Sequence, residues 1–114
     1  MTVLTIRAHK RYAVRQPVRV RKPGRQPAQG LMIELSSEGC RISNLGRGAF
    51  EIGEAVTLEV DELSFAGRIR WSHDGIAGVR LDHALFGGQL SELIARGRGE
   101  SPAHGERPLA RYGT

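Results

Sequence analysis

Two arginines near the start of the chain have a spacing suited to holding an anion. Arg11 and Arg15 are four residues apart in "RYAVR", an offset that puts two side chains on the same side of a helix or of an extended strand. The planar guanidinium group makes paired hydrogen bonds to phosphate, binds the O6/N7 edge of guanine and stacks on bases. The spacing therefore predicts a two-armed clamp. Arg7 and Arg11 have the same spacing, so either pair could form the clamp. The spacing could also arise by chance in an arginine-rich segment.

A polar turn further along the chain supplies more hydrogen-bonding groups. In "ELSSEGCRI", residues 34–42, Glu34, Ser36 and Gly39 lie between two runs that have the composition of strands. The Ser36 hydroxyl can donate and accept hydrogen bonds, and we expect Gly39 to supply a conformation that a Cβ atom would resist. The stretch is interpreted either as a plain hairpin turn or as one wall of a binding site.

Residues suited to catalysis or metal binding are scattered. The four histidines and Cys40 show no zinc-ligand spacing. No G-x-S-x-G sequence occurs, and "GRG" at 46–48 lacks the Lys-Ser/Thr that follows a phosphate loop. We therefore expect a binding protein rather than an enzyme, with no metal and no cofactor.

Length, composition and charge narrow the class of protein. The 114 residues, 39% of them hydrophobic, suit one domain with one modest core. The chain has no run near the roughly 20 apolar residues of a membrane helix, no secretion signal and a single cysteine, which predicts a cytoplasmic bacterial protein without membrane insertion. Residues 1–33 contain eight basic residues and no acidic one. Such a segment attracts anions, unless it is simply a solvated basic tail.

The pattern of apolar residues predicts a mainly β fold. Alternating or β-branched runs indicate six strands, and the 15 glycines suit tight turns. Leucines at near-helical spacing predict a helix that ends at Gly97. We expect a small six-stranded antiparallel β-barrel with a C-terminal helix over 17–96, preceded by a flexible basic segment (1–16) and followed by a disordered tail (97–114). The predicted strands cover 17–21, 30–35, 40–43, 55–60, 63–71 and 76–81.

In their order and spacing, these motifs resemble the PilZ domain family of bacterial cyclic di-GMP receptors. R-x-x-x-R stands just before the first strand, and acid-x-Ser-x-x-Gly follows about twenty residues later; "GRIRWSHDGIAGVRL" is similar to the family's fifth and sixth strands. The resemblance covers roughly residues 7–95. It implies that Arg11 and Arg15 contact phosphates and guanine from a flexible segment, and that Ser36 and Gly39 belong to the second motif.

Glu34 departs from the family pattern, which has Asp or Asn at the first position of the second motif. Glutamate keeps the carboxylate but is longer by one methylene. If the shorter acid fixes a guanine edge and the longer one misses it, the lost contact costs roughly 1–3 kcal/mol, or about tenfold to a hundredfold in affinity. We expect Trp71 to serve barrel packing rather than base stacking.

The resemblance implies a cyclic di-GMP receptor or adaptor, which could take up the ligand as an intercalated dimer. Binding would order residues 7–16 as a lid and be transmitted to an unidentified effector protein. One alternative is a degenerate PilZ-like domain that binds no nucleotide and acts as a protein–protein adaptor. The departure of Glu34 from the family pattern is the reason for this alternative. Another is a small basic barrel that binds RNA or DNA, against which the scarcity of aromatic residues counts. Both a monomer and a homodimer are open.

Overall fold

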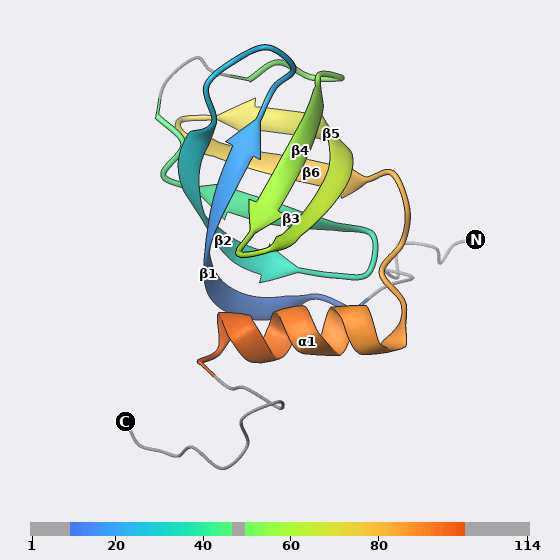
Figure 1. The fold of residues 1–114 in the computed structure, drawn as a ribbon. Coiled ribbons are helices and arrows are strands. Elements are labelled where there is room, and N and C mark those ends of the chain that lie inside the picture. The colour runs from blue at the N-terminus through green and yellow to red at the C-terminus, as the bar shows by residue number, and fades with distance from the viewer. Residues whose placement is uncertain (1–9, 47–49, 100–114) are drawn as a thin grey trace, which may run out of the picture.

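The computed structural model describes residues 10–46 and 50–99, which form six strands and one helix (Figure 1). The strands pair antiparallel in the order β1-β2-β3-β6-β5-β4, and β4 pairs with β1, so the sheet closes into a barrel. The predicted six-stranded antiparallel barrel with a C-terminal helix is confirmed. The elements are β1 (Tyr12–Arg21), β2 (Ala28–Leu35), β3 (Gly39–Ser43), β4 (Ala55–Val60), β5 (Leu63–His73), β6 (Ile76–Leu81) and α1 (Gly87–Gly97).

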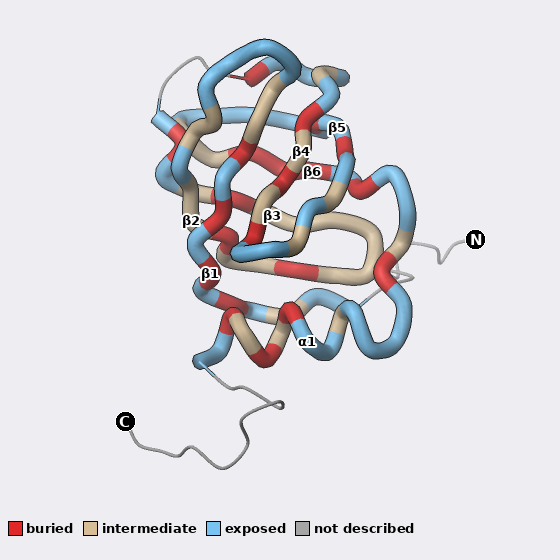
Figure 2. The backbone as a smooth tube through the Cα atoms, in the orientation of Figure 1, coloured by how far each residue is buried: buried red, intermediate tan, exposed pale blue. Residues whose placement is uncertain are grey.

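The core lies inside the barrel and is built almost entirely from aliphatic side chains. Inward and outward residues alternate along the strands, as the period of two in a strand requires (Figure 2). In β4, for example, Val56, Leu58 and Val60 are buried. Side chains on the outer face are therefore free to form binding surfaces without disturbing the core.

The first strand begins earlier than predicted. β1 starts at Tyr12 rather than at residue 17, so the last part of the segment assigned as flexible (1–16) is paired with β2. The inward alternation continues through Val14 and Gln16, both buried, and the polar Gln16 at an inward position hides this pattern in the sequence. Residues 1–9 lie outside the described residues.

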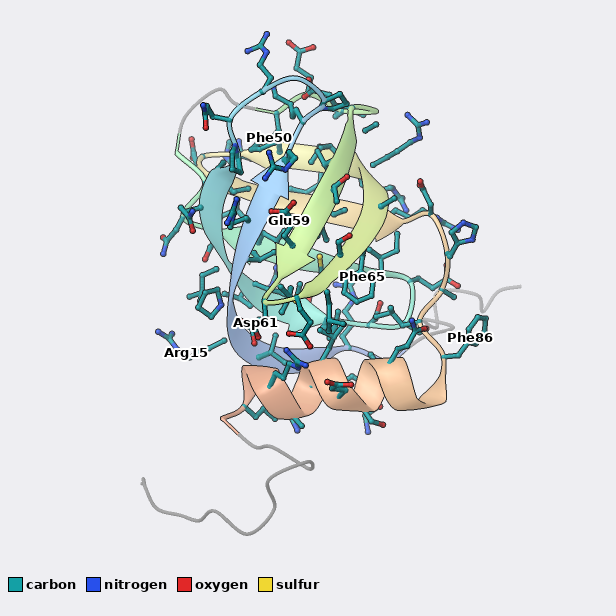
Figure 3. The ribbon with its side chains drawn as sticks, viewed as in Figure 1. Arg15, Phe50, Glu59, Asp61, Phe65 and Phe86 are labelled. Atoms are coloured by element: carbon teal, nitrogen blue, oxygen red, sulfur yellow. The ribbon has the colours of Figure 1, made fainter. Side chains whose placement is uncertain are left out.

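Helix α1 lies across one end of the barrel, alongside the first half of β1 (Figure 1). Leu93 and Ala95 are buried in this contact, and Gly97 packs against Val14. Arg96 forms ion pairs with Asp61 and Glu62, which join the helix to the β4–β5 turn, and with Glu92 on the helix itself. Figure 3 shows Asp61 next to the helix. The helix ends at Gly97, as predicted, and most of the predicted tail, residues 100–114, lies outside the described residues.

Two further findings concern the described residues only. They include no helix long and apolar enough to cross a membrane. Nor do they hold a group of three or more His, Cys, Asp or Glu side chains placed to hold a metal ion.

Candidate ligand-binding site

A hollow of about 200 Å³ lies on the outside of the barrel, where the β2–β3 turn meets the start of β1 and the outer faces of β5 and β6. Four of the five predicted site residues line it: Arg11, Glu34, Ser36 and Gly39. These residues come from two segments that are more than twenty positions apart in the chain. The antiparallel pairing of β1 with β2, which puts Tyr12 opposite Leu35, brings them together.

Ser36 organises the turn that forms one wall of the hollow. Its Oγ accepts hydrogen bonds from the backbone N–H groups of Glu38 and Gly39, each at 3.2 Å, and lies 3.3 Å from the Gly39 carbonyl oxygen. The Ser36 N–H donates to that same carbonyl at 2.8 Å. A serine hydroxyl that bonds to nearby backbone groups is a recognised way to fix a turn. Ser36 therefore shapes the wall through the backbone.

The turn is also tied to the elements behind it. The Glu38 carbonyl accepts a hydrogen bond from Leu81 N–H at the end of β6, and the Ser37 carbonyl accepts one from Leu85 N–H just before α1, both at 2.8 Å. The wall of the hollow is thereby connected to the segment that leads into the helix.

Gly39 is needed for a reason other than the predicted one. Its φ angle is not in the left-handed region, in contrast to several other glycines in the described part of the chain. Instead, a Cβ atom there would collide with the carbonyl oxygen of Val79 on β6. The glycine permits the close approach of β3 and β6 that forms the floor of the hollow.

Glu34, the residue that departs from the family pattern, is held between two arginines. Its Oε1 lies 3.2 Å from Nη1 of Arg11 and 3.8 Å from Nε of Arg41, its cross-strand partner on β3. The Arg41 Nε is shielded from solvent and makes no hydrogen bond to the described residues. A buried donor without a partner is costly, so the position of Arg41 beside Glu34 leaves one of its donors unsatisfied.

Arg15 does not line this hollow. Like Arg11 it is exposed and faces outward, and Figure 3 shows it directed away from the barrel beyond β1. The bulge between Ala13 and Gln16 changes the direction of the strand between the two arginines. Arg11 belongs to both registers of the R-x-x-x-R spacing, and it is the arginine that the fold brings to the turn.

Sequence reasoning missed four residues that line the same hollow. Arg70 and Trp71 come from β5, Arg80 from β6 and Arg41 from β3. Trp71 is 40% exposed, and its indole lies against Gly78, where a Cβ atom would collide with the ring. Trp71 therefore packs on the outside of the barrel and presents an aromatic surface to the hollow, in addition to the packing role that was predicted.

The electrostatics of the hollow are positive. Four guanidinium groups line it together with two carboxylates, those of Glu34 and Glu38. Arg80 Nη2 lies 3.4 Å from Glu38 Oε1. Cys40 also lines the hollow, and burial of its thiol raises the pKa to about 12, so it is a neutral group at physiological pH. An anion with a planar ring system matches these groups in charge and in shape.

Comparison with known proteins agrees with this geometry. The family model described as PilZ domain matches residues 5–95. A search of curated proteins found no match. The matched region includes all six strands and most of the helix, together with both arginines and the polar turn. PilZ domains bind cyclic di-GMP or act as adaptors and are not catalytic, and this chain belongs to the PilZ domain family.

Proposed function

We propose that this protein binds cyclic di-GMP in the hollow beside the β2–β3 turn and passes the signal to a partner protein. The observation that carries the proposal is that Arg11, Arg41, Arg70 and Arg80 surround one hollow next to an exposed indole. Guanidinium groups suit both phosphate and the O6/N7 edge of guanine, and an aromatic surface suits a purine. The proposal includes no catalytic step, metal or cofactor.

The size of the hollow limits what it holds. At about 200 Å³ it is smaller than the roughly 300–1,000 Å³ of typical ligand pockets. It would hold part of the dinucleotide, such as one guanine with its phosphate. The remainder would need a cover or a second ligand molecule, as in an intercalated dimer.

The chain just before β1 is the proposed cover. Residues 12–16 already belong to a strand, so we confine the ordering proposed for residues 7–16 to residues 7–11, of which 7–9 lie outside the described residues. In this proposal Arg11 leaves Glu34 and turns to the ligand, and an arginine four residues away, Arg7 or Arg15, completes the clamp.

The output would be a change in the surface around the β2–β3 turn, which backbone hydrogen bonds connect to β6 and to the start of α1. A cytoplasmic location and a monomeric or homodimeric state remain predictions. The effector protein is likewise a prediction.

A specific observation favours the adaptor alternative. The Glu34 carboxylate already lies beside Arg11 and Arg41, where a ligand phosphate or guanine would have to bind. If the ligand cannot displace it, the domain would bind no nucleotide and would serve as a protein–protein adaptor. Nucleic-acid binding is less well supported, because the described surface has few exposed aromatic side chains and many of its basic residues are paired with acids.

Titration calorimetry with cyclic di-GMP tests the proposal. We expect saturable binding that Arg11→Ala weakens by about tenfold to a hundredfold, the loss of a charged hydrogen bond worth about 1.5–3 kcal/mol. Arg7→Ala and Arg15→Ala, measured in parallel, identify the second arm of the clamp. Arg19→Ala removes an equal charge from β1, where Arg19 pairs with Glu59, and should leave the affinity unchanged.

Two results would count against a receptor. Absence of heat at high ligand concentration, with the protein folded, would favour the adaptor. Equal weakening by Arg11→Ala and Arg19→Ala would show that only overall charge matters. Amide exchange of residues 7–11, which should slow when ligand binds, checks the cover separately.

A further inference from the structure

Three arginines on the outer faces of β5 and β6 form a second basic surface, which we call the arginine strip: Arg68, Arg70 and Arg80. They line a hollow of about 460 Å³ together with Ile52 and Asp82. Arg68 and Arg80 are direct cross-strand partners. Like charges placed opposite each other on a sheet destabilise it, so the strip lowers the stability of the isolated domain.

The charges of the strip are poorly neutralised within the described part of the chain. The Arg70 side chain makes no hydrogen bond or ion pair with a described residue, and Arg68 donates only to the Gly53 carbonyl. Arg80 contacts Glu38 at 3.4 Å, and its side chain is 58% exposed. Asp82 lines the hollow without forming an ion pair with a described residue.

Some basic residues elsewhere on the barrel are neutralised. Glu59 lies 3.3 Å from Arg19 and 3.0 Å from Arg21, on neighbouring strands. Lys22 pairs with Glu54 at 3.2 Å. Unlike these paired residues, the arginines of the strip keep a net positive charge, which attracts an external anion.

The surroundings of the strip indicate the kind of anion. Ile52 is 75% exposed beside the three guanidinium groups, so the surface joins positive charge to an apolar contact. Among the described residues, no aromatic side chain lines this hollow, whereas single-stranded nucleic acids are usually held on aromatic platforms. The carboxylates around Glu59 and Glu54 interrupt any continuous basic track across the described surface.

We propose that the arginine strip is a docking surface for an acidic segment of a partner protein, one that carries several carboxylates and an apolar side chain for Ile52. Arg70 and Arg80 also line the hollow beside the β2–β3 turn. If the proposed function holds, a nucleotide that draws on these two arginines weakens docking of the acidic segment, and by linkage the segment weakens binding of the nucleotide by the same factor. Docking itself does not depend on the nucleotide.

The test uses a short fluorescein-labelled peptide rich in Glu with one Leu, measured by fluorescence anisotropy with the full chain. Arg68→Ser with Arg70→Ser should weaken binding about tenfold or more. The charge-matched control, Arg19→Ser with Arg21→Ser, should change it little. A peptide with Gln for Glu should not bind. Poly(U) RNA should bind the strip variant and the control variant with equal affinity.

Several results would overturn the proposal: equal losses in the two double variants, binding of the Gln peptide, or preferential binding of poly(U) through the strip. Chemical-shift mapping on the unmodified protein is a test that does not depend on the variants. Adding the peptide should shift the resonances of Arg68, Arg70 and Ile52. Adding cyclic di-GMP to the preformed peptide complex separates the two proposals. If the nucleotide does not change peptide binding, the docking surface stands and only the coupling between the two sites is wrong.

Discussion

Shortening the carboxylate at Glu34 should strengthen the binding of cyclic di-GMP. The Glu34 Oε1 lies 3.2 Å from Arg11 Nη1 and 3.8 Å from Arg41 Nε, so the carboxylate competes with an anionic ligand for both arginines. Glu34→Asp draws the charge back toward the backbone by one methylene and restores the acid of the PilZ pattern. Both arginines then become more available to the ligand.

The geometry bounds the size of this effect. The Arg11–Glu34 pair is partly exposed, with side-chain exposures of 44% and 26%, and ion pairs of this kind contribute about 0.2–1 kcal/mol. Removing a competitor of that strength raises affinity by at most about fivefold, because about 1.4 kcal/mol corresponds to a factor of ten. The free energy of unfolding should fall by no more than about 1 kcal/mol.

Titration calorimetry at roughly 0.15 M salt, where exposed charges are screened as in cells, measures the change. Glu59→Asp is the matched control, because Glu59 is also 26% exposed and is paired with two arginines, Arg19 and Arg21, on another face. It should leave the affinity unchanged. Weaker binding by Glu34→Asp, with the control unaffected, would refute the reasoning and show that the longer carboxylate itself contacts the ligand.

Three further predictions concern the fold. Gly39→Ala should destabilise the protein by about 1–3 kcal/mol in urea unfolding, because the new Cβ meets the β6 backbone. Gly88→Ala, in open space on α1, should stabilise it by roughly 0.5–1 kcal/mol. A Gly39→Ala variant more stable than Gly88→Ala would contradict the packing. Arg96→Met should lower stability at neutral pH. Because the Arg96 hydrogen bond holds the Glu62 pKa below its ordinary 4.5, the difference in stability from the unmodified protein should shrink as pH falls below 4.5 through that lowered pKa. A difference that does not change with pH would show that the ion pair with Glu62 is not its cause. Burial raises the pKa of Cys40 to about 12, so at pH 8 its thiol should react with iodoacetamide far more slowly in the folded protein than in urea, and equal rates would show an accessible thiolate.

The turn residues illustrate how far a local pattern reaches. The resemblance to the PilZ pattern predicts one candidate site from Glu34, Ser36 and Gly39, and these residues line one hollow; their contact with a ligand stays a prediction. The reason for Gly39 was not predictable, because it lies in the approach of β6, a strand that begins more than thirty residues later. Similarly, the spacing of Arg11 and Arg15 predicts a common side for a regular strand, but the bulge between Ala13 and Gln16 breaks that regularity.

The sequence by itself determined the six strands, the helix and the polar turn, since alternation, leucine spacing and turn residues are properties of neighbouring positions. Closure of the barrel and the register of its strands decided which residues far apart in the chain lie together. Register sets Arg68 opposite Arg80 and Trp71 over Gly78, and it brings Arg41, Arg70 and Arg80 around the turn. Such contacts join residues far apart in the chain, and a shift of one residue would turn every side chain to the other face. Only the folded barrel therefore assembles the basic surfaces on which both proposals rest.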